Sequence, residues 1–475
     1  MLVAPVVAAL TAPGAVGPPP RTPGGGVVRG ETLHRAAPLA PAAGHDRPVS
    51  IAAGPSAEVA SAPATVSRLS PASPSPETPS DLPPPPTPEV ALPPPPDLVS
   101  AIASQLAGSP LSQATVGVSV WIQGFGEVVT HNADLALVPA SNQKLNTAVA
   151  ALSLVPPGTT FRTEVRATGT AEGGVLLGDL FLVGGGDPTL RRSGPHSLDA
   201  LAAAVRAAGI EQVAGAVLGD DSRYDAVRAA PGWRPGYLPA YIGPLSALVV
   251  DGNRYRRDAD FVADPVTSNV ALFRKALLRH GVRVLGGDGK GRAPAGAQVV
   301  SLSSEPVEAL VARMLTDSDN LVAELLLKEV GLWATGEGST AAGVAAADEL
   351  LGALGVGGSS ADGSGLSLGN LRSARQWRLL LQAIRALPVG QLIVDSLPRA
   401  GQTGTLVRRL AGTAGEGNVR AKTGAIAGVR ALSGYLSTAG GRPAVFSIIV
   451  NGTQVGPPVT WAIDRLIATI AADGS

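Results

Sequence analysis

The chain has 475 residues, of which 45% are hydrophobic and 16% charged, enough for two or three domains with apolar cores. Its formal net charge is zero and it has no long basic run, which argues against nucleic acid or an anionic membrane surface as a partner. The absence of cysteine excludes disulfides and thiolate chemistry, and the five histidines are scattered without metal-ligand spacing. We therefore expect neither a metal nor a cofactor.

The N-terminal region has two parts, neither of which reads as a folded domain. Residues 1–16 are apolar and match the core of an export signal or membrane anchor in length, although the first basic residue is Arg21. An apolar tail is the alternative. Residues 17–96 are rich in Pro, Ala, Ser and Gly, so we expect an extended, disordered linker. In polyproline II form, residues 72–96 would reach roughly 70–80 Å, long enough to tether a catalytic domain to a membrane; a passive tail remains the alternative.

The folded part is expected to begin near Asp97 and to bring the two ends of the chain into one sheet. Helical periodicity and period-2 alternation predict terminal helices, two early strands and three late strands. This pattern predicts an α/β domain with an antiparallel sheet flanked by helices, made of residues 97–161 and 300–475. The predicted helices are 98–106 and 459–467, and the predicted strands are 115–122, 127–130, 418–423, 429–436 and 443–450.

Residues 162–299 interrupt this domain, and we interpret them as a separate, smaller α/β domain inserted into it. The segment alternates between strand-like and helix-like pieces and shows no fixed-period repeat. Its predicted strands are 175–177, 180–183 and 213–218, and its predicted helices are 198–205 and 270–278.

Serine and lysine lie three residues apart in the segment Ser-Asn-Gln-Lys, at Ser141 and Lys144. A run of good helix formers follows, which predicts that Ser141 lies at a helix N-terminus and that the Lys144 amine can reach its hydroxyl. A serine hydroxyl needs a base to act as a nucleophile, and a lysine can serve if burial lowers its pKa. A serine cap followed by a solvated lysine is the alternative.

A second motif, Ser318-Asp319-Asn320, falls between two helical runs. By itself it could be an ordinary helix cap, since all three residue types cap well. In a catalytic context, Ser318 can relay a proton to a leaving amine, and Asn320 can hydrogen-bond a substrate amide and hold the lysine.

The third motif, Lys422-Thr423-Gly424, is predicted to end a strand. A cation and a hydroxyl at this position could fix a terminal carboxylate, and Gly424 would let a substrate backbone approach closely. An edge-strand lysine before a turn is the alternative. The three motifs have no physical reason to occur together except a shared cleft, and the lysines of the first and third are among only five in the chain.

In this order the motifs resemble those of the penicillin-binding D-alanyl-D-alanine carboxypeptidases and endopeptidases of peptidase family S13, also called class C low-molecular-mass penicillin-binding proteins. The resemblance covers roughly 97–472 and implies a serine β-lactamase/DD-peptidase domain with inserted domains. Four further segments are similar to that family: 182–190, 230–233, 362–367 and 419–424.

The resemblance implies a role for each motif residue. Ser141 would be the acylated nucleophile and Lys144 its base, with Ser318 and Asn320 completing the proton relay and the substrate contacts. The backbone N–H groups of Ser141 and Ala425 would form the oxyanion hole. Lys422 and Thr423 would bind the terminal carboxylate of the substrate.

The resemblance also implies a substrate and a compartment. The family acts on the D-Ala-D-Ala end, or the D-amino-acid cross-link, of peptidoglycan stem peptides, and β-lactams acylate it. We therefore expect an enzyme of the extracytoplasmic cell envelope, secreted or tethered through its N-terminus. The insertion is shorter than in members with two extra domains, so a third domain is reduced or absent. Within 219–224 we assign Asp220 to the side chain of the stem peptide, with an acidic loop turn as the alternative.

Two other functions remain as alternatives. A class A β-lactamase needs a glutamate that activates the deacylating water, and no glutamate between Ser318 and Lys422 begins the Glu-x-x-x-Asn pattern of that class. The glutamates there are Glu324, Glu329, Glu337, Glu349 and Glu416. The second alternative is a catalytically idle envelope protein that binds peptidoglycan or β-lactams without turnover.

Overall fold

The computed structural model describes residues 92–108, 110–254, 264–295 and 297–475, all within one compact unit. The expected apolar segment 1–16 and most of the expected linker lie outside the described residues. The folded part begins slightly before Asp97, because the backbone N–H of Leu92 donates to the carbonyl of Gly124 and the first helix begins at Pro96. No helix in the described part of the chain is both long and apolar enough to cross a bilayer.

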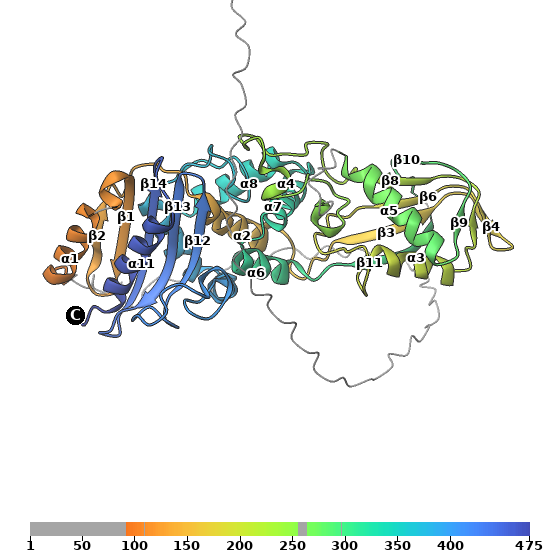
Figure 1. Cartoon of the computed structure of the whole chain (residues 1–475). Coiled ribbons are helices and arrows are strands. Elements are labelled where there is room, and N and C mark those ends of the chain that lie inside the picture. The colour runs from red at the N-terminus through yellow and green to blue at the C-terminus, as the bar shows by residue number, and fades with distance from the viewer. Residues whose placement is uncertain (1–91, 109, 255–263, 296) are drawn as a thin grey trace, which may run out of the picture. The chain divides into compact units, whose positions relative to one another are not determined.

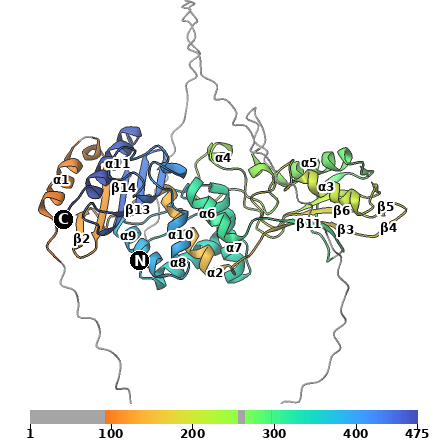
Figure 2. The ribbon, with the colours of Figure 1, turned by 90° about the horizontal axis from the view of Figure 1, so that it is seen from below.

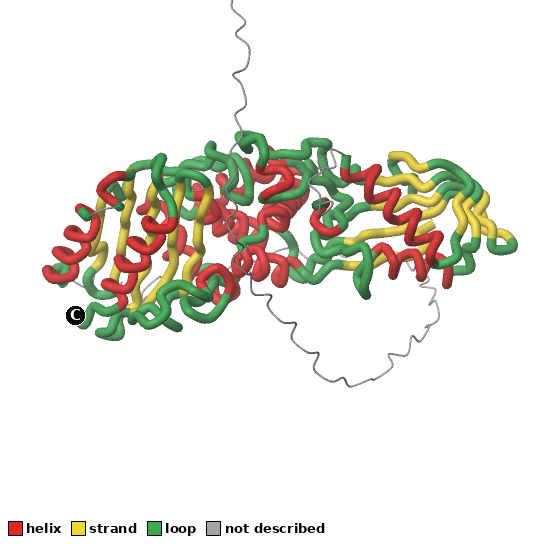
Figure 3. Tube along the Cα trace, in the orientation of Figure 1, coloured by secondary structure: helices red, strands yellow, loops and turns green. Residues whose placement is uncertain are grey.

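Both ends of the described chain meet in one antiparallel sheet of five strands, in the order β12-β13-β14-β1-β2 (Figures 1 and 3). The early strand β1 pairs along its whole length with the last strand β14, from Thr115 opposite Asn451 to Ile122 opposite Ala444. The expected antiparallel sheet that joins the two chain ends is therefore confirmed. Its strands are β1 (Thr115–Ile122), β2 (Gly126–His131), β12 (Arg420–Ile426), β13 (Val429–Ser437) and β14 (Pro443–Asn451).

The sheet is covered on both faces because its strands alternate between two apolar cores. In β14, Phe446 and Ile448 join the core under α1 (Pro96–Ala107) and α11 (Pro457–Ala471), whereas Val445 and Ile449 join the opposite core. The helices of the opposite core carry two of the three motifs. They are α2 (Gln143–Leu154), α6 (Val307–Asp317), α7 (Asn320–Thr335), α8 (Thr340–Ala353), α9 (Ala374–Ala386) and α10 (Gly390–Ser396).

The inserted segment has its own core and two further sheets. Helices α3 and α5 pack on one face of its larger sheet (Figure 2). Phe273 and Val205 are buried in the core that they share with this sheet. The larger sheet has the order β10-β8-β6-β3-β11 and the smaller one β4-β5-β7-β9. The elements are β3 (Arg162–Ala167), β4 (Thr170–Glu172), β5 (Val175–Leu177), β6 (Leu180–Val183), α3 (Leu198–Ala207), β7 (Gln212–Val213), β8 (Val217–Asp220), α5 (Pro265–Arg279), β9 (Arg283–Val284), β10 (Asp288–Lys290) and β11 (Ala297–Ser303).

Two expectations for the insertion need correction. The single strand expected over 213–218 is divided into β7 and β8, which belong to different sheets. The division falls at Gly215, where a Cβ would lie 2.2 Å from Oδ1 of Asp179. The expected boundary at residue 299 falls inside β11, which pairs with β3 as far as Ser303 opposite Arg162. The division into two domains remains our proposal, with this boundary moved to Ser303.

Part of the inserted segment packs against the catalytic elements rather than against its own sheets. Tyr237, in the short helix α4 (Tyr237–Ala240), and the buried Leu245 share an apolar cluster with Ala140, which precedes Ser141, and with Leu321 of α7. This part of the insertion therefore helps to shape the surroundings of the first two motifs.

Candidate active site

Ser141 lies in a single 3-10 turn, Ala140–Asn142, that leads directly into α2. The residue before it, Ala140, has a left-handed φ of 48°, a conformation that a non-glycine residue adopts only when its surroundings impose it. Gly365 packs against this turn so closely that a Cβ would lie 1.9 Å from the carbonyl oxygen of Ala140. Gly365 therefore leaves this turn little room to move, which fixes the direction of the Ser141 side chain.

Lys144 is completely buried one turn along α2 from Ser141. Its Nζ donates hydrogen bonds to Oγ of Ser141 (3.1 Å), Oδ1 of Asn320 (2.7 Å) and the carbonyl oxygen of Ser364 (2.6 Å). The expected contacts from Lys144 to the serine and to the asparagine are both present. These three acceptors fix the orientation of the amine. The charged form points one N–H at the Ser141 hydroxyl, and the neutral form has its lone pair available to accept the proton of that hydroxyl.

Burial lowers the pKa of Lys144 from 10.5 to about 8, although the carboxylates of Asp362, Glu324 and Asp319 oppose the change. With this pKa, roughly a tenth of the molecules carry a neutral amine at pH 7, against well under a thousandth for an ordinary lysine. The site therefore supplies a usable base at neutral pH.

The second motif divides its three residues between two tasks. Asp319 caps α7, since its Oδ1 accepts the backbone N–H groups of Leu321 (3.0 Å) and Val322 (3.1 Å). Ser318 ends α6 with a left-handed φ of 59°, and Asn320 is the first residue of α7. The helix-cap interpretation thus holds for Asp319, while Ser318 contacts Lys422 and Asn320 contacts Lys144.

The third motif lies inside β12 and not at its end, which corrects the expectation from sequence. The strand continues to Ile426 because β12 pairs with β13 along its whole length. The Nζ of buried Lys422 donates to Oγ of Ser318 (2.9 Å) and to the carbonyl oxygen of Thr423 (3.0 Å). Burial, together with the charge of Lys144, holds the pKa of Lys422 well below its usual range.

The motifs line one cavity of about 320 Å³ beside β12, the edge strand of the sheet. Thr423 reaches this cavity with its hydroxyl 2.8 Å from that of Thr405, and Ala425 is exposed on the same strand. A Cβ at Gly424 would lie 2.6 Å from the carbonyl oxygen of Pro139, so this glycine is required by the close approach of the Ser141 turn. The described lining is Ser141, Ser318, Thr405, Arg409, Thr423, Gly424, Ala425, Arg430, Ala431, Thr460 and Ile463.

Two buried carboxyl groups behind Lys144 were not assigned a role from sequence. Oε1 of Glu324 accepts the N–H groups of Gly363 (3.1 Å) and Ser364 (2.8 Å), and burial raises the pKa of Glu324 to about 8. Asp362 accepts the N–H of Gly365 (2.8 Å) and the indole N–H of Trp233 (2.9 Å). A charged residue inside the apolar helical run of α7 was the available signal for Glu324.

Asp220 does not join the catalytic cluster. At the end of β8 its carboxylate accepts the N–H groups of Ser222 (2.9 Å) and Ala293 (2.7 Å), as an acidic turn residue does. It lines a different cavity, of about 770 Å³, that does not include Ser141. The geometry therefore favours the turn interpretation of Asp220 over contact with a stem peptide bound in the cavity at Ser141.

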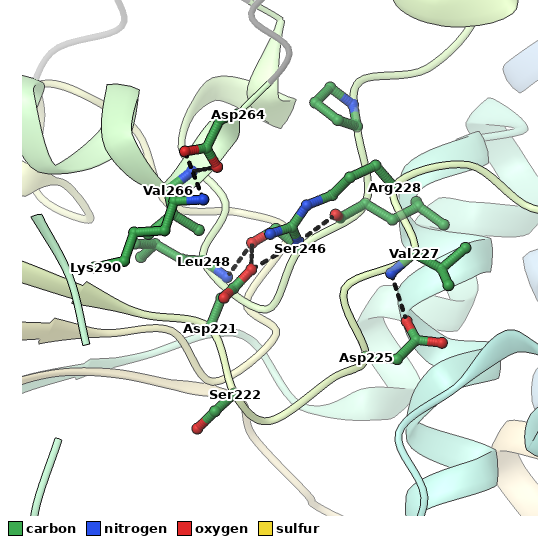
Figure 4. A network of polar contacts seen from close by, with 12 residues as sticks. Asp221, Ser222, Asp225, Val227, Arg228, Ser246, Leu248, Asp264, Val266 and Lys290 are labelled. Carbon is green, nitrogen blue, oxygen red and sulfur yellow. Dashed lines mark hydrogen bonds and ion pairs between the residues drawn. The ribbon is translucent and has the colours of Figure 1, made fainter. Parts of the chain in front are cut away.

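The residues after Asp220 fix the inserted segment in place (Figure 4). Asp221 forms an ion pair with Arg228 (2.6 Å) and accepts the hydroxyl of Ser246 (2.8 Å), which in turn accepts the N–H of Leu248 (3.1 Å). This network holds the segment that packs against Ala140 and Leu321.

The loop also binds the second half of α7. Arg223 donates to both carboxylate oxygens of buried Glu329 (2.6 and 2.8 Å), and the Tyr224 hydroxyl donates to the same carboxylate (2.7 Å). Buried Lys328 forms an ion pair with Asp225. The inserted segment therefore binds the second half of α7, the helix that begins with Asn320.

The chain is similar in sequence and in fold to known proteins. A D-alanyl-D-alanine carboxypeptidase of Actinomadura sp. is 33% identical over 461 residues, covering 79% of this chain and 85% of that protein. A carboxypeptidase of Mycobacterium tuberculosis is 32% identical over 360 residues, covering 70% of this chain and 75% of that protein. The crystal structure of penicillin binding protein 4 from Haemophilus influenzae superposes with a TM-score of 0.71 at 23% identity, covering 78% of this chain and 99% of that one.

The model of the D-Ala-D-Ala carboxypeptidase 3 (S13) family matches residues 98–263 and 259–473, which include all three motifs and the inserted segment. The chain belongs to the D-Ala-D-Ala carboxypeptidase 3 (S13) family.

Proposed function

We propose that this protein is a serine D-alanyl-D-alanine carboxypeptidase that acts on peptidoglycan stem peptides through an acyl-enzyme on Ser141. The observation that carries the proposal is the position of Lys144, buried and hydrogen-bonded to the Ser141 hydroxyl at 3.1 Å with a pKa lowered to about 8. The names of the relatives from Actinomadura and Mycobacterium support the same activity.

In the acylation step, the neutral amine of Lys144 takes the proton from Oγ of Ser141, and Oγ attacks the carbonyl carbon of the penultimate D-Ala. The backbone N–H groups of Ser141 and Ala425 are proposed to stabilise the oxyanion that forms. When the peptide C–N bond breaks, the terminal D-Ala leaves as an amine and needs one proton.

Ser318 is proposed to deliver that proton. Its hydroxyl accepts from Lys422 at 2.9 Å, and Asn320 holds Lys144 at 2.7 Å on the same side of the site. The proton passes from Lys144 through the Ser318 hydroxyl to the leaving nitrogen, and Lys144 becomes neutral again. A water molecule then attacks the acyl carbonyl and Lys144 takes its proton. The bond between the acyl carbon and Oγ of Ser141 breaks, Lys144 returns the proton to Oγ, and the shortened peptide leaves as a carboxylic acid.

Lys422 and Thr423 are proposed to bind the carboxylate of the terminal D-Ala. Burial makes the charged form of Lys422 costly in the empty cavity, and an entering carboxylate restores it. The Thr423 hydroxyl, beside that of Thr405, offers a second donor. Arg430 adds positive charge to the same cavity, whereas Arg409 is paired with Asp464 at 2.6 Å.

The same chemistry extends to two related ligands. In a peptide cross-link, the carbonyl of D-Ala is bonded to the nitrogen at a D-configured carbon of another stem peptide. This bond presents the same carbonyl to Ser141, so we propose endopeptidase activity beside carboxypeptidase activity. A β-lactam presents a reactive carbonyl and a carboxylate, so it should acylate Ser141 as a covalent inhibitor. Because peptidoglycan lies outside the cytoplasmic membrane, we place the enzyme in the extracytoplasmic envelope, with residues 1–16 as the proposed signal or tether.

Labelling with penicillin, followed by intact-mass measurement and peptide mapping, tests the proposal. We expect one adduct on Ser141 of the wild type, none on Ser141→Ala, and release of D-Ala from a D-Ala-D-Ala peptide only by the wild type. Absence of an adduct on folded protein would refute serine acyl transfer. An adduct without D-Ala release would favour the idle binding protein, and rapid loss of the adduct would favour a β-lactamase.

A further inference from the structure

The larger sheet of the inserted segment has one face that no described helix covers. Residues opposite one another in paired strands point to the same face, so the register assigns each side chain to a side. Val165, Leu182 and Val217 belong to the core under α3 and α5. The other face carries Arg162, Glu164, Arg166, Phe181, Val183, Leu218, Asp220, Ser301 and Ser303.

Part of this second face forms the floor of the 770 Å³ cavity. Arg162, Glu164 and Arg166 of β3 lie on the floor, Arg223 and Arg292 form part of the walls, and the end of α7 closes one side with Leu332 and Gly336. The described lining of this cavity therefore contains four guanidinium groups, two on the floor and two in the walls.

The charges in this cavity are not balanced. Arg166 is paired with Glu164 at 2.7 Å, and Asp220 is occupied by two backbone N–H groups. Arg162 and Arg292 are exposed, and no carboxylate of a described residue lies within 4.0 Å of either guanidinium group. Two cations are therefore available to an external anion.

Arg223 adds a pre-organised donor. Its Nε and Nη2 are fixed by Glu329, which is almost fully buried, while its Nη1 has no hydrogen-bond partner among the described residues. A guanidinium group held in this way loses little entropy when a carboxylate binds to its free edge.

The cavity is separate from the catalytic site but rigidly connected to it. Asn320 at the start of α7 contacts Lys144, and Leu332 near its end lines the cavity, twelve residues or about 18 Å farther along the helix. A polymeric ligand can therefore occupy both places at once, and a second contact raises its effective concentration at the first.

We propose that this arginine-lined groove binds the peptide-stem carboxylates of a peptidoglycan strand and so holds the polymer while another stem enters the catalytic cavity. The proposal rests on the proposed function. Carboxylates match the planar fork of arginine, and the apolar Val183 and Leu332 suit the methyl groups of alanine-containing peptides. Phosphodiester polymers share the negative charge and are the competing source.

The test is co-sedimentation with purified, insoluble peptidoglycan from which attached phosphate polymers have been removed, using full chains that carry Ser141→Ala so that no turnover occurs. We expect the added pair Arg162→Ala and Arg292→Ala to weaken binding about tenfold or more. Arg292→Lys should retain part of the affinity. Arg465→Ala, an exposed arginine on α11, is the matched control and should bind as the parent does.

Three outcomes would overturn the proposal: no binding by the parent chain, equal binding by the arginine pair, or binding only to wall material that retains its phosphate polymers. Converting the carboxylates of the peptidoglycan to neutral amides should also weaken binding. Penicillin labelling of the same arginine variants with Ser141 intact keeps the two proposals apart. If the arginine variants are labelled normally and sediment as the parent does, only the groove proposal is refuted. If the wild type is not labelled by penicillin, the catalytic proposal is refuted.

Discussion

Glu324 and Lys144 are connected through a single residue, Ser364. Oε1 of Glu324 accepts the N–H of Ser364 at 2.8 Å, and the carbonyl oxygen of Ser364 accepts a hydrogen bond from Lys144 at 2.6 Å. All three residues are fully buried. The orientation of the base therefore depends on a carboxyl group that does not reach the substrate cavity.

The protonation of Lys144 should set the pH dependence of acylation. The neutral amine is the base, so the second-order rate constant for penicillin acylation should rise with pH and level off above a midpoint of about 8. Lys144→Arg, which stays charged, should lower the rate by about 10²-fold or more. Stopped-flow acylation between pH 6 and 9.5 measures both effects. The exposed Lys275→Arg should leave the profile unchanged, and a flat profile in the wild type would contradict the role of Lys144.

Glu324 should make stability depend on pH. Its pKa is about 8 in the folded state and 4.5 in the unfolded state, so between these values the folded protein holds a proton that the unfolded chain has lost. This contribution is fully present below pH 4.5 and declines as pH rises to about 8. We expect the Tm of the wild type minus that of Glu324→Gln to fall over this range in thermal unfolding. Parallel Tm curves would count against a protonated Glu324, and exposed Glu349→Gln is the control.

Lys422 should recognise the carboxylate of the substrate. Lys422→Gln is expected to lower kcat/KM for a D-Ala-D-Ala peptide about 10- to 150-fold, the loss of one charge-assisted hydrogen bond. The same peptide with a C-terminal amide tests the assignment. The wild type should prefer the free acid strongly, and the variant should lose most of that preference. If the variant kept the full preference, the carboxylate would bind elsewhere; surface Lys290→Gln is the matched control.

Gly365 should be indispensable for the shape of the Ser141 turn. A methyl group there would lie 1.9 Å from the carbonyl oxygen of Ala140 and 2.9 Å from the Ser141 nitrogen, at a φ of 86°. We expect Gly365→Ala to cost about 1–3 kcal/mol of stability and to slow penicillin acylation. Gly352→Ala is the control, because it lies within α8 with no atom within 4 Å of the added Cβ. Normal acylation by Gly365→Ala would show that the turn adapts.

The ion pair between Arg223 and Glu329 should hold the inserted segment on α7. Glu329 is almost fully buried, so Glu329→Ala leaves a guanidinium group and the Tyr224 hydroxyl without their partner. We expect a loss of about 3 kcal/mol in denaturant unfolding. Exposed Glu337→Ala is the control, and equal stability of the two variants would exclude a structural role for the pair.

The main sheet and the three motifs could be predicted from sequence because their signals are local. Alternation in 115–122 and 443–450 matches β1 and β14 closely, and the motifs occur as short strings. The division of the strand expected over 213–218 could not be predicted from sequence, because it depends on the contact between Gly215 and Asp179, which are distant in sequence. The extension of β12 beyond Gly424 depends likewise on its pairing with β13.

The environment of the base was the least predictable part of the site. Glu324 falls in an apolar helical run, and its partners Gly363 and Ser364 belong to a loop far along the chain. The sequence shows that a carboxyl group in such an apolar run is unusual, but it does not show which backbone N–H groups that carboxyl group accepts. The strand register that separates Arg162 from the core of the insertion is non-local in the same way.

The pairing of β1 with β14 means that the catalytic centre is completed last. A nascent chain that stops before Pro443 already contains all three motifs, yet it lacks the strand that lies between β13 and β1. Such a chain should react poorly with β-lactams, because β12 and β13 would contact the Ser141 turn without the strand that pairs them into one sheet with β1. Covalent labelling by penicillin therefore counts finished molecules, and it can serve as a direct assay of how far maturation of this protein has progressed.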